Sequence, residues 1–223
     1  MGRERYRDRL ATLRTDIVLF GELVVERYES AVAAAANGDL RDADRIVRGD
    51  DEINRRYLKL EGDCIDLIAR NQPVAGDLRL ITASFKILTD LERIGDLATN
   101  LAERTEYGAS IHPAVDIESL GMAAGEMVDA AVDAYEDDDP AACRGVAADD
   151  DSLDSDCEAT TQRIIRKLLA EQAAGDSEGL ARTVDETTRG LLTVRDIERV
   201  GDHAVNIAAR TLYMLDNDDE LLY

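Results

Sequence analysis

The sequence is poor in aromatic residues, in long apolar runs and in cysteines, and the last two scarcities each exclude a class of protein. Aromatic residues make up only 4% of the chain, and no uninterrupted apolar run approaches the roughly eighteen residues of a membrane span. Three cysteines without paired spacing, Cys64, Cys143 and Cys157, support neither a disulfide framework nor a Cys-rich zinc site. We therefore expect a cytoplasmic protein that does not insert into membranes.

Positive charge is also scarce. The chain has 48 acidic against 26 basic residues, a formal charge of −22, and its only lysines are Lys59, Lys86 and Lys167. Such a chain repels the phosphates of nucleic acids and anionic lipids, so we expect no direct nucleic-acid binding. Concentrated salt weakens self-repulsion, because the Debye length falls to about 3 Å at 1 M. The composition therefore indicates adaptation to salt, as in a halophile.

Motifs of catalysis are missing too. Nucleophile elbows, phosphate-binding glycine loops and Ser/His/Asp or Cys/His sets do not occur. Neither His112 nor His203 follows a glutamate by three residues, as a ferritin-like di-iron site requires. We expect no enzyme activity, and we expect His203 to be an ordinary helix residue.

Helical periodicity runs through most of the chain. Apolar residues recur at helical spacing from Tyr6 onward, the second predicted helix runs unbroken from about Asp39 to Asn71, and the acidic run from Asp216 is expected to fray. We predict an all-α fold of six long antiparallel helices, arranged as two tandem pseudo-symmetric three-helix bundles, residues 1–108 and 109–223. The predicted turns lie at Asn37–Asp39, Gln72–Pro73, near Gly108, at Glu136–Asp139 and at Gly175–Ser177.

One stretch of the sequence is written twice. The segment DLERIGDLATNLAERTEY, from Asp90 to Tyr107, recurs as DIERVGDHAVNIAARTLY, from Asp196 to Tyr213, at an offset of 106 residues (198 − 92). The second copy repeats acids, which are common in this chain, and also a glycine, an arginine and an asparagine. The repeat therefore indicates two similar halves, each large enough for a small bundle with its own core.

Each copy places carboxylates on a helix face that is otherwise apolar. Glu92 and Asp96 continue the apolar seam of their helix, and Glu198 and Asp202 do the same in the second copy. Carboxylates at seam positions are costly to bury unless an arginine or a metal ion meets them. The adjoining Gly95, like its counterpart in the second copy, leaves room for a close neighbour or an ion.

A second acidic cluster lies near the start of the preceding helix in each half. Asp50 and Asn54 correspond to Asp150 and Asp154 at an offset of 100 residues (150 − 50). Consecutive helices are antiparallel, and both clusters of the first half lie about twenty residues from the turn at Gln72, so they meet at one level. The predicted metal ligands are Glu92, Asp96, Asp50 and Asn54 in the first half and Glu198, Asp202, Asp150 and Asp154 in the second.

The residues leave the occupant of these sites open. Oxygen ligands without His or Cys favour hard or borderline cations such as Mg, Ca, Mn or carboxylate-bridged iron. Ion pairs with Arg93 and Arg199 are the structural alternative, and they predict a metal-free bundle. An alternative from another class is a carboxylate-bridged metal-storage protein or a metal-dependent hydrolase.

The motifs DLERIGD, DIERVGD, DDEIN and QPVAGDLR resemble those of the PhoU family of phosphate-uptake regulators, and the likeness covers nearly the full length. The resemblance implies two tandem three-helix bundles, each with a Glu/Asp-x-x-x-Asp motif that binds metal, iron or zinc clusters among them. Asn54 departs from the acid at its counterpart, Asp154. The metal itself, whether iron, zinc, magnesium or another, is not decided.

The same resemblance implies a negative regulator of the high-affinity phosphate ABC transporter and of phosphate signalling. Such a protein acts through protein–protein contacts with transporter components and, in bacteria, with a membrane sensor kinase. We also expect a homodimer.

Overall fold

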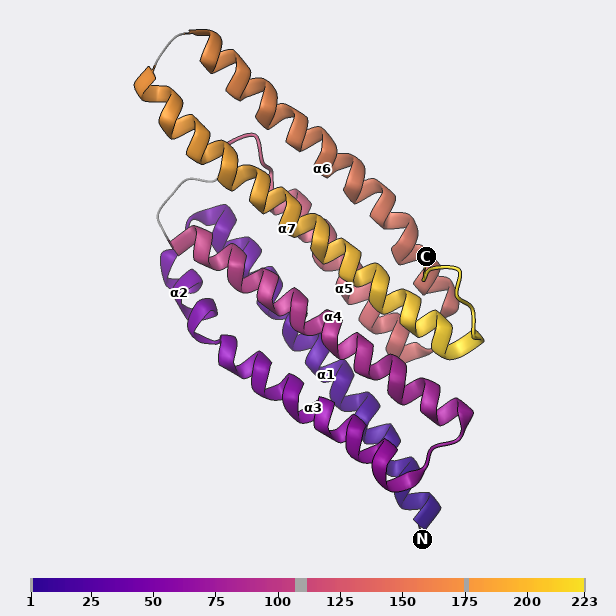
Figure 1. The fold of residues 1–223 in the computed structure, drawn as a ribbon. Helices are drawn as coiled ribbons and strands as arrows, with labels where there is room; N and C mark the ends of the chain where they lie inside the picture. Colours follow the sequence, from indigo (N-terminus) through magenta and orange to yellow (C-terminus); the bar gives the residue numbers. More distant parts are fainter. Residues whose placement is uncertain (1, 107–111, 175–176, 223) are drawn as a thin grey trace.

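The computed structural model describes residues 2–106, 112–174 and 177–222, and all of its regular elements are α-helices. The helices lie side by side along an elongated molecule, with α1 to α4 on one side and α5 to α7 on the other (Figure 1). None of the described helices is long and apolar enough to cross a bilayer. The predicted all-α fold is confirmed. The helices are α1 (Gly2–Asn37), α2 (Leu40–Arg48), α3 (Asp50–Asn71), α4 (Ala75–Glu106), α5 (Ile117–Asp137), α6 (Pro140–Ala174) and α7 (Ser177–Asp216).

Two of the predicted turns are built alike. Gly38 ends α1 in the left-handed conformation with φ 65°, and Asp39 caps α2 by accepting the N–H of Arg41 at 2.9 Å. In the second half Asp138 takes the same conformation with φ 56°, and Asp139 caps α6. The predicted turns at Gly108 and at Gly175 and Asp176 lie outside the described residues.

The prediction of an unbroken second helix is wrong. The helix breaks at Gly49 into α2 and α3, and the Arg27 guanidinium of α1 donates to the carbonyl oxygens of Gly49, at 2.9 Å, and of Ile46. Carbonyl groups at a helix end need such a partner. A Cβ added at Gly49 would lie 2.8 Å from Arg27 Nη2, so a glycine permits this close approach.

The acidic C-terminal run is held in place, contrary to the expected fraying. Arg144 of α6 pairs with Asp218 at 3.0 Å and with Glu220 at 3.4 Å, and Arg79 of α4 donates to Asn217 at 3.0 Å. These partners lie far away in the sequence, which is why the local sequence did not reveal them.

The two halves pack together through α1 against α5. Gly21 meets Val132, and Gly121 meets Val32, so residues that correspond at an offset of 100 (121 − 21 and 132 − 32) exchange contacts. An added Cβ would lie 2.8 Å from the Val132 side chain at Gly21 and 2.6 Å from the Val32 side chain at Gly121. This reciprocal contact is what an internal twofold axis produces.

The halves also meet through α4 against α7, and this contact contains buried charged groups. His203 Nδ1 lies 2.9 Å from Asp90 Oδ1, and Arg104 pairs with Asp196. The Asp196 side chain is 5% exposed and that of His203 is 7% exposed. His203, expected to be an ordinary helix residue, thus has a specific partner in the other half.

Candidate metal centres

In the first half the acidic groups of α3 and α4 face each other. Thr99 Oγ1 of α4 donates to Asp50 Oδ1 of α3 at 2.9 Å. Burial raises the pKa of Glu92, and the nearby charges of Asp96 and Asp50 raise it further. Burial and the charge of Asp50 likewise raise the pKa of Asp96. The structure therefore brings these predicted ligands to one level, as the antiparallel arrangement requires.

The second half repeats this arrangement on α6 and α7. Burial raises the pKa of Glu198, and the charges of Asp154 and Asp202 raise it further. Burial, followed by the charges of Asp154 and Asp202 and then by those of Asp151 and Glu198, raises the pKa of Asp150 to about 6. The predicted second-half ligands therefore influence one another electrostatically.

The acids lie at the solvent edge of the seam, not inside it. Glu92 is half-buried, whereas Asp96, Glu198 and Asp202 keep much of their surface in solvent, so the burial that raises the pKa of Asp96 and Glu198 is only partial. Charged groups without a buried partner are costly to remove from water, which explains the edge position. The expectation that the seam carries these carboxylates into the interior is therefore wrong for Asp96, Glu198 and Asp202, and Glu92 lies only partly inside.

The two arginines of the repeated motif do not neutralise the clusters by direct contact within the described residues. Arg93 and Arg199 are exposed, and no ion pair within residues 2–106, 112–174 and 177–222 joins either of them to a predicted ligand. The charge of Arg93 does lower the pKa of Glu92 and Asp96, against the larger effect of burial. Direct neutralisation by these arginines, the structural alternative, is absent from the described contacts.

The donor groups fit a hard cation. Asp150 Oδ1 is buried and has no hydrogen-bond partner, so it requires a water molecule or a cation. A Cβ at Gly201 would lie 3.0 Å from this oxygen. Carboxylate and amide oxygens are the ligands that such cations prefer. In the described part of the chain no three His, Cys, Asp or Glu side chains are gathered closely enough to hold an ion, so binding requires these side chains to draw together.

Three neighbours of the clusters escaped the sequence analysis. Arg27 lies close enough to Asp50 for that charge to act on its pKa, against the larger lowering by burial. Its counterpart at an offset of 100 is Met127, near Gly201. Burial, followed by the charge of Glu198, raises the pKa of the Cys157 thiol to about 12, so that thiol stays protonated. Matching the turns at residues 38 and 138 would have revealed the Arg27 and Met127 pair.

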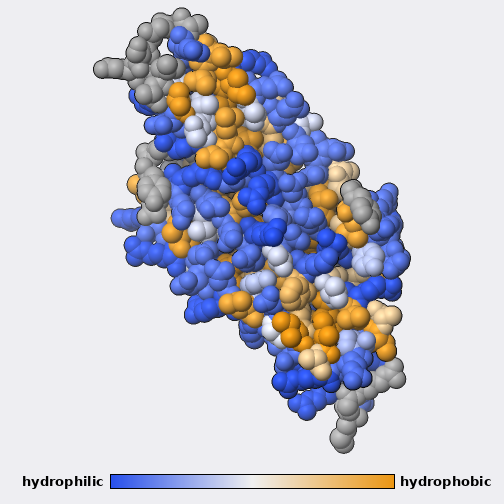
Figure 2. Space-filling model, in the orientation of Figure 1, coloured by the Kyte–Doolittle hydropathy of each residue, from blue (hydrophilic) through white to orange (hydrophobic). Residues whose placement is uncertain are grey.

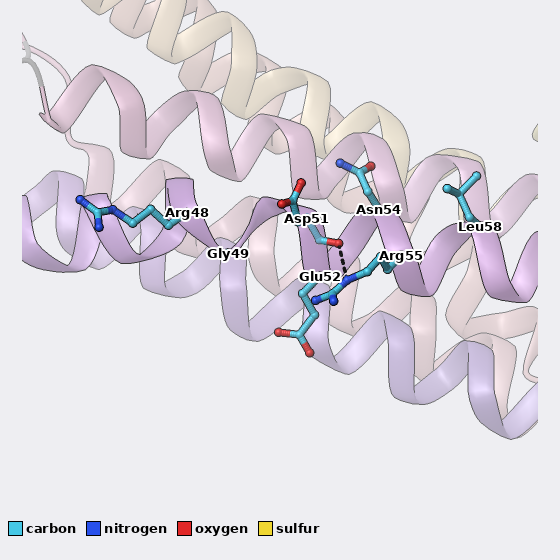
Figure 3. A pocket seen from close by; sticks show the side chains of 7 residues that line it. All are labelled: Arg48, Gly49, Asp51, Glu52, Asn54, Arg55 and Leu58. Carbon is cyan, nitrogen blue, oxygen red and sulfur yellow. Dashed lines mark hydrogen bonds between the residues drawn. The ribbon is translucent and has the colours of Figure 1, made fainter.

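Two open hollows lie beside the clusters. One of about 520 Å³ lies where α2 meets α3, and Figure 3 shows Asp51 and Asn54 pointing to one side of α3 and Glu52 to the other. The other, of about 260 Å³, lies between α5 and α6 and includes Met127. Neither hollow is lined by the motif carboxylates of α4 or α7. The first is lined by Arg48, Gly49, Asp51, Glu52, Asn54, Arg55 and Leu58.

Fold and site together define a class: a duplicated helical bundle with an acidic cluster between two helices of each half. Comparison with known proteins narrows this class. The PhoU domain matches residues 17–105 and again residues 117–211. The chain therefore belongs to the PhoU family.

Individual relatives extend the likeness over almost the whole chain. The phosphate-specific transport system accessory protein PhoU homolog of Pseudomonas aeruginosa is 29% identical over 220 residues, which are 97% of this chain and 87% of the relative. The crystal structure of PhoU from the same organism has a TM-score of 0.83 at 28% identity, over 96% of this chain and all of the other. The phosphate transport system regulatory protein PhoU from Streptococcus pneumoniae shares the fold, with a TM-score of 0.81 at 23% identity over 96% and 98% of the two chains.

Proposed function

We propose that the protein is a negative regulator of high-affinity phosphate uptake that acts in the cytoplasm by contacting components of a phosphate ABC transporter. Family membership through both halves carries the proposal, supported by a relative named as a phosphate-specific transport system accessory protein that is matched over 87% of its length. Contact with a sensor kinase, in organisms that have one, belongs to the same proposal.

The proposal includes cation binding at the two acidic clusters. Its support is the oxygen-only donor set and the unpartnered Asp150 Oδ1. When bound, a divalent cation supplies positive charge between α3 and α4 or between α6 and α7. The ligands would be Glu92, Asp96, Asp50 and Asn54 in the first half and Glu198, Asp202, Asp150 and Asp154 in the second.

Exposed apolar residues at the two helix turns support a protein–protein contact. Figure 2 shows hydrophobic side chains gathered towards both ends of the molecule, with hydrophilic ones between. Ile65 near the α3–α4 turn is 53% exposed and its counterpart Ile165 on α6 is 43% exposed, while Leu78 and its counterpart Val184 are 41% and 45% exposed. Apolar side chains that gather into an exposed patch mark interaction sites, whereas single scattered ones do not.

The regulatory role is tested by replacing Glu92, Asp96, Glu198 and Asp202 with alanine in the native host. We expect loss of repression and increased phosphate accumulation. A matched control, Glu22→Ala with Glu26→Ala, Glu29→Ala and Glu103→Ala, removes the same charge from exposed positions elsewhere and should leave uptake unchanged. Normal phosphate accumulation in the first variant, with the folded protein present, would count against the role of these acids.

The contact surface is tested by Ile65→Lys together with Ile165→Lys. These changes should weaken co-purification with transporter components and leave the thermal unfolding temperature unchanged, because both positions are exposed. Leu19→Lys is the control, since Leu19 is 50% exposed on α1 and its counterpart in the duplication is Ser119, which is not apolar. The proposed homodimer is tested by light scattering of the unmodified protein.

A further inference from the structure

The two acidic clusters correspond by duplication, but they treat their first aspartate differently. In the first half both Asp50 oxygens have a donor within reach. Oδ2 accepts from Asn54 Nδ2 at 3.0 Å, and Oδ1 lies 2.9 Å from Thr99 Oγ1, whose single hydrogen also has the Gly95 carbonyl oxygen within reach, at the longer distance of 3.1 Å. Asp50 is therefore satisfied by the side chains of its own half.

The second half has neither of these donors. Val205 stands where Thr99 stands in the first half (99 + 106), and Asp154 stands where Asn54 stands (54 + 100). Valine has no hydroxyl group, and a carboxylate only accepts hydrogen bonds at neutral pH. In agreement, Asp150 Oδ1 is buried with no partner.

The two halves also differ in a positively charged side chain beside the cluster. In the first half the Arg27 guanidinium is fixed on the Gly49 carbonyl at 2.9 Å, and the charge of Asp50 acts on it. Met127 occupies the corresponding position on α5, with its Cε 3.6 Å from where a Cβ on Gly201 would lie. Methionine is apolar, so the second cluster lacks this neighbouring cation. It also has one more carboxylate than the first cluster, because Asp154 stands in place of Asn54.

We propose that the second cluster, made by Asp150, Asp154, Glu198 and Asp202, is the tighter cation site and fills first, whereas the first cluster is compensated internally by Arg27, Asn54 and Thr99. This inference rests on the proposed cation binding and adds the order in which the two sites fill. A cation at the second cluster relieves repulsion among four carboxylates and supplies the missing partner of Asp150. At the first cluster a cation competes with Arg27 and with two hydrogen bonds already made.

The test exchanges the two clusters. Asp154→Asn with Val205→Thr gives the second half the donors of the first, and Asn54→Asp with Thr99→Val removes them from the first half. Mn²⁺ is titrated alone into each full-length protein, with free Mn²⁺ followed by electron paramagnetic resonance and the unfolding temperature measured with and without Mn²⁺. All proteins are first stripped with a chelator that is then removed by dialysis.

We expect the unmodified protein to show one tight and one weak class of site. The second-half exchange should weaken the tight class about tenfold or more, a loss typical of altered metal surroundings, and should raise the unfolding temperature without Mn²⁺. The first-half exchange should tighten the weak class. Two equal sites in the unmodified protein, or a tight class untouched by the second-half exchange, would overturn the inference alone. No Mn²⁺ binding at all would overturn the cation part of the proposed function with it.

Discussion

At the break between α2 and α3, Arg27 holds two carbonyl oxygens and lies near Asp50, whereas in the second half Met127 takes that place and α6 continues without a break. The packing around both sites is nevertheless alike. A Cβ on Gly95 would meet Ile53 at 3.0 Å, and a Cβ on Gly201 would meet the corresponding Leu153 at 2.6 Å.

The contact between α4 and α7 likewise has different polar partners in the two halves. Asp196 pairs with Arg104, whereas its counterpart Asp90 pairs with His203. Close glycine contacts recur in both halves, but the polar partners differ. The comparison teaches that the duplicated backbone is fixed by packing, while charge balance is free to diverge between the halves.

The largest effect expected from this comparison is at the buried charges. Asp196→Ala leaves Arg104, whose side chain is 18% exposed, without its buried carboxylate and should cost about 3 kcal/mol of unfolding free energy. Asp90→Ala should cost only about 1 kcal/mol, because a histidine, unlike an arginine, can become neutral. Denaturant unfolding measures both, and equal losses would contradict the asymmetry.

The glycine contacts on the twofold axis are expected to come next. Gly121→Ala places a Cβ 2.6 Å from the Val32 side chain, and overpacking of this kind costs about 2 kcal/mol. Gly62→Ala is the control, because nothing lies within 4 Å of its Cβ and an exposed helix position gains about 1 kcal/mol from alanine. Adding Val32→Ala should restore part of the Gly121→Ala loss. A stabilising Gly121→Ala would show that the halves are not packed this tightly.

A smaller effect is expected from pH. The folded pKa of Asp150 is about 6, above the value near 3.9 of an unfolded chain. Only the folded protein holds this proton between those values, so the contribution of Asp150 to stability falls as pH rises from about 4 to about 6.

In metal-free buffer Asp150→Asn should therefore be more stable than the unmodified protein at pH 7, by about 1 kcal/mol after allowance for solvent screening, and nearly equal to it at pH 4. Asp50→Asn, which removes the aspartate that already has two donors, is the matched comparison in the first half and should not stabilise the protein. Thermal unfolding at the two pH values checks both variants. Stabilisation by Asp50→Asn but not by Asp150→Asn would contradict the claim that Asp150, and not Asp50, lacks a partner.

Much of the fold was predictable, because helical spacing and the duplicated segment are local signals. The caps at Gly38 and Asp39 and the meeting of Asp50 with the α4 cluster follow from such signals. The break at Gly49 was not predictable, because it depends on Arg27, which lies in another helix.

The sequence predicted which residues make up the candidate sites, but not how the charges and hydrogen bonds in each site are balanced. The sequence placed Asp50 and Asp150 as equivalents, yet which of them has hydrogen-bond donors depends on Thr99 and Val205 of the neighbouring helices. The pairing of His203 with Asp90 also depends on how the halves dock. Metal binding by the predicted ligands stays a prediction.

Elemental analysis of protein purified without chelators tests the central claim most directly, with the alanine variant of Glu92, Asp96, Glu198 and Asp202 prepared in parallel. We predict a few bound divalent ions per chain in the unmodified protein and almost none in the variant. Metal content far beyond a few ions per chain would favour a storage protein. Equal metal content in the two preparations, or none in either, would contradict the claim that the duplicated acids bind metal.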